Sequence, residues 1–179
     1  MAAIGALSAI GALFLRGVMR LLGASPKALR EFIRLISALH MFVYRLTGGS
    51  VTGRLGLRNA RMILLTTTGR KSGKERTIPL LCIKDAEDLV VIASHGGLDQ
   101  PPAWWLNLLE NPEARVHVGR RTIKVRAEQA DPQARSRLWP RFVRAIQGYE
   151  DYRRRTTREL PIMVLHPVED TGGNRDGKD

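Results

Sequence analysis

The sequence predicts an α+β fold: a small β-barrel of about six strands with flanking helices and an N-terminal helical extension. Three observations predict it. Short segments rich in β-branched and apolar residues recur between turn residues, helical patterns interrupt them singly, and no internal repeat appears. A length of 179 residues and an apolar content of 44% suit one domain with an appendage.

The first 24 residues differ in composition from the rest of the chain. Residues 2–15 carry no charge, and Arg16 and Arg20 follow at helical spacing. The uncharged run is shorter than the about 20 apolar residues that span a bilayer. Residues 1–24 therefore predict an apolar and basic helix. It lies in a membrane interface with its arginines among the headgroups, or packs on the barrel or on a second subunit; a spanning helix that reaches past Arg16 is the third alternative.

A second helix is predicted at the start of the main domain, which we expect to cover residues 25–169. Ser25 is a capping residue and Pro26 suits the first helical position. Apolar residues then recur at helical spacing up to about Arg45. This stripe is typical of a helix face that covers a core.

The centre of the chain predicts two strands joined by a short basic turn. Met62–Thr68 is rich in β-branched and apolar residues, and Gly69 and Gly73 let the chain turn sharply. A return strand begins at Arg76, in which Pro79 predicts an edge or a bulge. The turn and its flanks hold four cations and a hydroxyl: Arg70, Lys71, Ser72, Lys74 and Arg76. This composition predicts an anion cradle, with an ordinary charged surface turn as the alternative.

Strands and a short helix follow this hairpin. Leu89–Ser94 is apolar enough to be a strand that is buried on both faces. Ala103–Glu110 predicts a short helix, because a proline precedes it and Asn-Pro follows it. Residues 116–127 predict a second hairpin with one wet face, since Lys124 and Arg126 alternate there with apolar residues.

The last third of the chain predicts a longer helix and a final strand. Asp131, followed by proline, caps the helix, and a basic segment with two tyrosines follows it at 148–155. Leu160–His166 predicts the last strand. Residues 170–179 are polar and glycine-bearing, which predicts a disordered tail.

Charge and motif content limit the function. The formal net charge of +12 predicts an anionic partner: an acidic cofactor, an anionic membrane or nucleic acid. The single cysteine, Cys82, excludes an internal disulfide, and the four histidines lack ligand spacing, so we expect no metal site. The glycine fingerprint of nicotinamide dinucleotide binding is absent. The common nucleic-acid motifs are absent too, so we do not expect nucleic acid as a partner.

The basic turn belongs to an ordered series of motifs that resembles the deazaflavin-dependent nitroreductase family. Members of that family are split β-barrel oxidoreductases that bind coenzyme F-420. The motifs, in chain order, are Tyr44–Gly49, Gly69–Lys74, Ala93–Gly97, Pro102–Leu108, Asn111–Pro112, Gly148–Tyr149 and Arg158–Pro161. The resemblance covers roughly residues 40 to 168, and the ordered set carries it rather than any single motif.

The resemblance implies a set of cofactor-binding residues. Four would hold the phosphate and the tail carboxylates: Arg70, Lys71, Ser72 and Arg76. Five would line the deazaflavin ring: Thr77, Ile78, Pro79, Leu80 and Leu81. Further contacts would come from a strand end, a helix and a tyrosine: Ile92, Ala93, Ser94, His95, Ala103, Trp104, Trp105, Leu106, Asn107 and Tyr149. His95 stands where the family often has lysine, and Trp105 where it usually has tyrosine.

The resemblance also implies the chemistry. Reduced coenzyme F-420, an 8-hydroxy-5-deazaflavin, would transfer a hydride to a quinone-like or nitroaromatic acceptor, with Ser94, Tyr149 and Tyr152 as catalytic residues. The alternatives are a split-barrel flavoprotein that uses FMN, and a non-catalytic basic barrel that adheres to membranes or nucleic acid. We expect a cytoplasmic protein that binds the inner face of the cell membrane through residues 1–24. The sequence allows self-association but does not define an oligomeric state.

Overall fold

The computed structural model describes residues 31, 35, 60–119, 121–146 and 148–168. The helix predicted over residues 1–24, all but two positions of the helix predicted over 25–45, and the tail 170–179 lie outside them. Within the described part of the chain, no helix has the length and apolar character needed to cross a bilayer.

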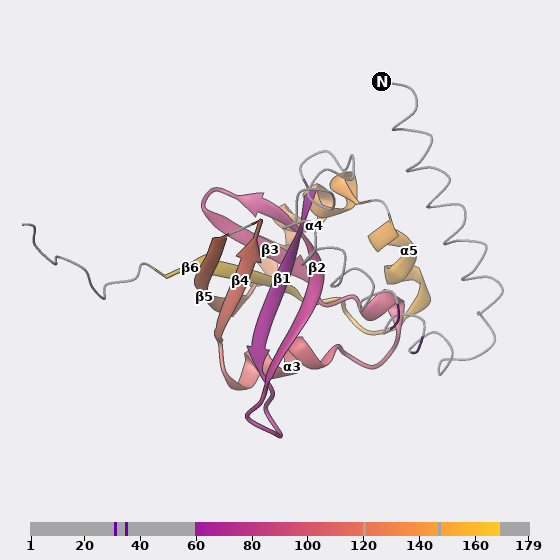
Figure 1. Ribbon diagram of the computed structural model, residues 1–179. Coiled ribbons are helices and arrows are strands. Elements are labelled where there is room, and N and C mark those ends of the chain that lie inside the picture. Colours follow the sequence, from indigo (N-terminus) through magenta and orange to yellow (C-terminus); the bar gives the residue numbers. More distant parts are fainter. Residues whose placement is uncertain (1–30, 32–34, 36–59, 120, 147, 169–179) are drawn as a thin grey trace, which may run out of the picture.

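Six strands of the described chain form a closed antiparallel barrel (Figure 1). They are β1 (Ala60–Thr68), β2 (Glu75–Asp85), β3 (Asp88–Ile92), β4 (Glu113–Val118), β5 (Arg121–Gln129) and β6 (Ile162–Pro167). The order around the barrel is β1-β2-β3-β6-β5-β4, and pairing between β1 and β4 closes it. The predicted α+β barrel of six strands is confirmed.

The barrel interior is apolar because alternate residues of each strand point inward. Ile63, Leu65, Val91 and Leu165 are among the buried side chains that fill it. Helix α3 (Ala103–Glu110) lies across the lower end of the barrel in Figure 1, and its Trp104 and Leu108 join the same cluster. The predicted short helix therefore closes one end of the core.

Two further helices cover the outer side of β3 and β6. They are α4 (Pro132–Ala145) and α5 (Gly148–Arg155), joined to the barrel by a second cluster of buried residues. Val90 and Ile92 of β3 pack there against Phe142 of α4. Because Leu89 and Val91 face the interior, β3 is buried on both faces, as predicted. Asp131 caps α4 by accepting a hydrogen bond from Ala134 N at 2.7 Å.

The two halves of β2 have different surroundings. Its first half, Glu75–Leu81, pairs only with β1 among the described strands, whereas Cys82–Asp85 also pairs with β3. Pro79 lies in the half with one neighbour, which confirms the predicted edge. The β4–β5 hairpin has the predicted wet face, since Lys124 and Arg126 are exposed while Val125 is buried.

Candidate functional site

The basic turn between β1 and β2 is closed by its own backbone. Gly69 N donates to Lys74 O at 2.9 Å, and Gly73 N donates to Gly69 O at 2.7 Å. Gly73 has φ +65°, in the left-handed region that glycine adopts without steric cost. A side chain at Gly69 would press on Lys74 O and Ser72 Oγ, each 3.0 Å from the position of its Cβ. Both glycines are therefore required by the shape of the turn.

Asn107 of α3 fastens this turn to the barrel. Its Oδ1 accepts a hydrogen bond from Arg70 N at 3.1 Å, and its Nδ2 donates to Thr67 Oγ1 at 3.1 Å. The side chain is buried, so these bonds are well shielded from water. The resemblance implies a cofactor contact for Asn107, and the structure gives its amide two partners within the protein. Asn107 therefore holds the turn in place, and a cofactor contact from its remaining donor or acceptor stays a prediction.

The turn presents positive charge to solvent. Arg70, Lys71, Lys74 and Arg76 are all exposed, as is Ser72 between them. None of the four cations forms an ion pair with a described acid, since the neighbouring Glu75 pairs with Arg115 instead. Four uncompensated cations on an anchored turn suit an acidic ligand, whose oxygens would replace their water.

Next to the turn, the first half of β2 offers an apolar surface. Thr77, Ile78, Pro79, Leu80 and Leu81 are all half-buried. Ile78 and Leu80 pack against the barrel cluster, and Leu81 packs against Met62 and Leu64 on the outer side. This strand edge has no further described strand beside it, so a flat ligand has access to its backbone and side chains. The surface thus fits the ring-lining role that the resemblance implies.

The three residues expected to be catalytic lie together. The Ser94 side chain lies close enough to the Tyr149 hydroxyl to lower its pKa, and the rings of Tyr149 and Tyr152 meet edge to face with centroids 5.5 Å apart. Burial raises the pKa of Tyr149 far above its ordinary value. Tyr152 and, more weakly, Cys82 raise this pKa further, whereas Ser94 lowers it by hydrogen bonding. Tyr149 therefore keeps its proton on Oη across the neutral range.

His95 begins a short 3-10 turn, His95–Gly97, directly after Ser94. Its backbone has φ +47°, an uncommon conformation outside glycine. The ring Nδ1 lies 2.8 Å from Gln100 O. Because a carbonyl oxygen only accepts, Nδ1 must carry the hydrogen, and the ring is tied to its own loop.

The remaining predicted residues of the site divide between the core and the surface. Ala93 and Trp104 belong to the barrel core, whereas Ile92 faces α4 and α5. Trp105 is half-buried and its Nε1 donates to Gln129 Oε1 at 3.3 Å. Ala103 is exposed and Leu106 is half-buried on α3. Only one of the two tryptophans is buried, as one short helix face allows.

Arg158 holds the Ser94 loop, a role that sequence reasoning missed. Its guanidinium donates to the carbonyl oxygens of Ser94 and Leu98 at 2.8 and 2.9 Å. The available signal was its position in the matched motif Arg158–Pro161. The sequence cannot show this contact, because Arg158 and Ser94 are 64 positions apart.

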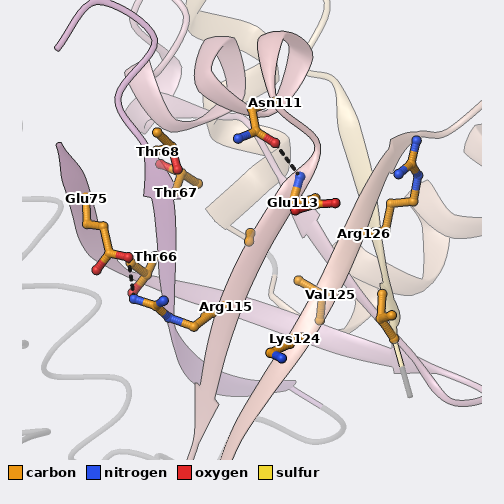
Figure 2. A pocket seen from close by; sticks show the side chains of 12 residues that line it. Thr66, Thr67, Thr68, Glu75, Asn111, Glu113, Arg115, Lys124, Val125 and Arg126 are labelled. Carbon is orange, nitrogen blue, oxygen red and sulfur yellow. Dashed lines mark hydrogen bonds and ion pairs between the residues drawn. The ribbon is translucent and has the colours of Figure 1, made fainter. Parts of the chain in front are cut away.

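A separate cavity of about 400 Å³ lies against β1, β4 and β5, on the wall of the barrel that α4 and α5 leave uncovered. Figure 2 shows its lining, in which Glu75 and Arg115 form an ion pair at 2.5 Å across the strands. Lys124, Arg126 and Glu113 complete its charged groups. No residue predicted for the site lines this cavity, and two carboxylates oppose its three cations, so we assign it no ligand. Among the described residues, no cluster of three or more metal-ligating side chains occurs.

The barrel and its anchored turn define a class of protein, the split-barrel proteins. A solved structure described as an F420-H2 dependent reductase has this fold, at 31% identity and a TM-score of 0.55 over 59% of this chain and 93% of that one. A second, described as a domain-swapped dimer, aligns at 28% identity and a TM-score of 0.57 over 72% of this chain and 96% of that one.

The chain belongs to the F420H(2)-dependent quinone reductase family, whose sequence profile matches residues 37–167. An F420H(2)-dependent quinone reductase of Mycobacterium tuberculosis is 34% identical over 131 residues, 71% of this chain and 87% of that protein. A putative F420H(2)-dependent quinone reductase of the same organism is 38% identical over 105 residues, 59% of this chain and 88% of that protein. The predicted relationship to F-420-dependent split-barrel oxidoreductases is confirmed.

Proposed function

We propose that this protein is an oxidoreductase that passes a hydride from reduced coenzyme F-420 to a quinone. The family match over residues 37–167 carries the proposal. The site supports it, because the exposed cations of the turn adjoin the half-buried, one-sided edge of β2. An acidic tail and a flat ring need these two surfaces side by side.

The residues of the turn would bind the acidic part of the coenzyme. Arg70, Lys71 and Arg76 offer charged donors and Ser72 offers a hydroxyl, so phosphate and carboxylate oxygens would find partners along one turn. Because Asn107 fixes the backbone at Arg70, the cations are held near one position before the ligand arrives. Bound reduced F-420 supplies the hydride.

The edge of β2 and the Ser94 loop would orient the reactants. Thr77 to Leu81 would support the ring on its apolar side and exclude water from it. Ser94 and Tyr149 form a pair of protonated hydroxyls, buried beside Tyr152. Such hydroxyls can donate to an oxygen on which negative charge develops, which is the electrostatic role a quinone acceptor requires.

The test is a titration and a turnover assay on the full chain. Oxidised F-420 is titrated into the protein and its fluorescence followed, and reduced F-420 is then mixed with menadione, a small quinone, while oxidation is monitored by absorbance. We expect Arg70→Ala and Lys71→Ala each to weaken F-420 binding about tenfold, because each removes a charged contact. Lys84→Ala, an exposed cation elsewhere on β2, is the matched control and should bind normally.

Two outcomes would contradict the proposal. One is tighter binding of FMN than of F-420 in the same titration, which would favour the flavoprotein alternative. The other is equal F-420 affinity in the Arg70→Ala, Lys71→Ala and Lys84→Ala proteins, which would remove the turn from the site. A nitroaromatic compound in place of menadione tests whether the acceptor range extends to nitro groups.

A membrane-peripheral location is part of the proposal and concerns residues 1–24. The support is compositional, since residues 2–15 are uncharged and Arg16 and Arg20 follow them. A quinone acceptor dissolved in lipid would then lie close to the site. We expect deletion of residues 1–23 to abolish flotation with anionic vesicles while F-420 affinity is kept, and equal flotation of both proteins would refute this part.

A further inference from the structure

We propose that Arg158 is a positioning residue, which sets the place of the Ser94 hydroxyl by clamping the loop from Ser94 to Leu98. The catalytic consequence rests on the function proposed above. The clamp itself is a property of the fold and has a separate test.

Arg158 donates to three backbone carbonyls from a position between α5 and β6. Its Nε donates to Leu98 O at 2.9 Å, one terminal nitrogen to Ser94 O at 2.8 Å, and the other to Glu159 O at 3.2 Å. Its side chain forms no ion pair with a described acid, since Asp99 accepts a hydrogen bond from Thr156 instead. The planar guanidinium thus joins the two ends of the loop as a rigid fork.

The clamped loop has a conformation that a free chain would seldom keep. His95, Gly96 and Gly97 have φ of +47°, +66° and +81°, three left-handed residues in succession. Gly96 and Gly97 adopt this region without steric cost, whereas His95 keeps it only where surrounding contacts impose it. Internally the loop has only two backbone hydrogen bonds, Gly97 N to Ser94 O at 2.9 Å and Leu98 N to His95 O at 3.2 Å. Arg158 supplies two further contacts.

The loop is also packed closely on α5. A side chain at Gly97 would place its Cβ 2.9 Å from Tyr152 O, so the backbone of the loop touches the helix that carries both tyrosines. The Ser94 side chain lies beside the Tyr149 hydroxyl across this contact and influences its pKa. Arg158 contacts the carbonyl of Ser94 and not its hydroxyl, so removing the guanidinium would shift Ser94 relative to Tyr149 while both hydroxyls remain present.

The chain offers a matched control in Arg135 of α4. Arg135 also donates to a backbone carbonyl, Leu160 O at 2.7 Å, and its side chain is similarly shielded. Like Arg158, it ties the segment before β6 to a neighbouring element. It contacts Glu159 and Leu160 and neither Ser94 nor Leu98, so its loss removes a tie on the segment before β6 without removing a contact to the loop.

The test compares the full-length Arg158→Met, Arg158→Lys and Arg135→Met proteins with the unchanged chain. Arg158→Met should lower kcat for menadione reduction about tenfold to a hundredfold, because small displacements of a reacting group have effects of this size. Its F-420 affinity should stay within about threefold, since the turn that holds the acidic tail is intact. The kcat of Arg158→Lys should lie between those of Arg158→Met and the unchanged chain, because an ammonium can contact one carbonyl but cannot bridge two as a guanidinium does.

Hydrogen exchange gives a readout that does not depend on turnover. The Gly97 and Leu98 amides should exchange faster in Arg158→Met, and Arg135→Met should leave them as they are in the unchanged chain. If the unchanged chain does not reduce menadione, the proposed function fails. Hydrogen exchange at Gly97 and Leu98 then tests by itself whether Arg158 holds the loop. Equal kcat in Arg158→Met and Arg135→Met, or unchanged exchange at Gly97 and Leu98, would overturn the inference. If Arg158→Met does not fold, Arg158→Lys against Arg135→Met provides the same comparison.

Discussion

The two halves of β2 belong to one strand and differ in nearly every physical respect. The first half, Glu75–Leu81, has one neighbouring described strand, half-buried apolar residues and a basic turn at its start. The second half pairs with β3 and lies under α4 and α5, where Ile83 is buried. Under the proposed function, this barrel separates cofactor binding from stability along a single strand. The half with only one described neighbouring strand is the half proposed to accept the ligand.

The sharpest test of this comparison replaces one residue in each half, on the same face of the strand. Ile83→Ala should lower the free energy of unfolding by about 2–5 kcal/mol, because it opens a cavity beneath the helices. Leu81→Ala removes a half-buried side chain and should cost about 1 kcal/mol, but it should weaken F-420 binding several-fold. Urea denaturation and the fluorescence titration measure the two effects. Equal losses of stability would mean that the two halves are not distinct.

A second test separates the turn from the strand that follows it. Asn107→Ala leaves Arg70 N–H and the Thr67 hydroxyl without their partner, so we expect a loss of about 1–3 kcal/mol in stability and weaker F-420 binding. Asn111→Ala is the control, because the Asn111 side chain accepts from Glu113 N at an exposed position and forms no hydrogen bond to the turn. If Asn107→Ala binds F-420 as well as Asn111→Ala does, the anchor has no part in binding.

The smallest expected effect concerns acid stability at the end of the second half. Hydrogen bonds from Arg137 and Arg141 of α4 lower the pKa of Asp85 from 3.8 to about 2. Because the folded pKa is depressed, this stabilisation is complete above the unfolded pKa and is lost as the pH falls from about 4 to about 2. Both arginines are substantially exposed, so Asp85→Asn should cost about 1 kcal/mol at neutral pH.

Denaturation at several pH values checks this third prediction. The difference in stability between Asp85→Asn and the unchanged chain should shrink towards zero as the pH approaches about 2. The free energy of F-420 binding should show no such dependence on Asp85, since the residue lies in the half of β2 that is remote from the turn. A difference that persists below pH 2 would rule out the carboxylate as its cause.

Much of the fold could be predicted because it follows from local patterns. Gly69 and Gly73 mark the turn, Asp131 with its proline marks the start of α4, and Pro79 marks the open edge of β2. Each is a short-range effect of backbone conformation or of a missing N–H group. The grouping of Ser94, Tyr149 and Tyr152 came instead from the family resemblance, and the structure places them together.

The parts that could not be predicted depend on contacts between distant segments. Asn107 meets Thr67 across 40 positions, and Arg158 meets Ser94 across 64. The sequence shows an asparagine on a helix and an arginine before a strand, both of which occur without such partners. Nothing in their immediate neighbours distinguishes a residue that holds a loop from one that contacts a ligand.

The sequence by itself determined the family, the six strands, helices α3 and α4 and the basic turn, because periodicity and turn chemistry are recorded residue by residue; it did not predict that 148–155 forms helix α5. Only the tertiary structure decided which half of β2 stays open, which tryptophan enters the core, and which side chains fasten the turn and the Ser94 loop. The reason is barrel closure: the pairing of β3 with β6, as between Leu89 and Leu165, fixes distances that no local pattern encodes.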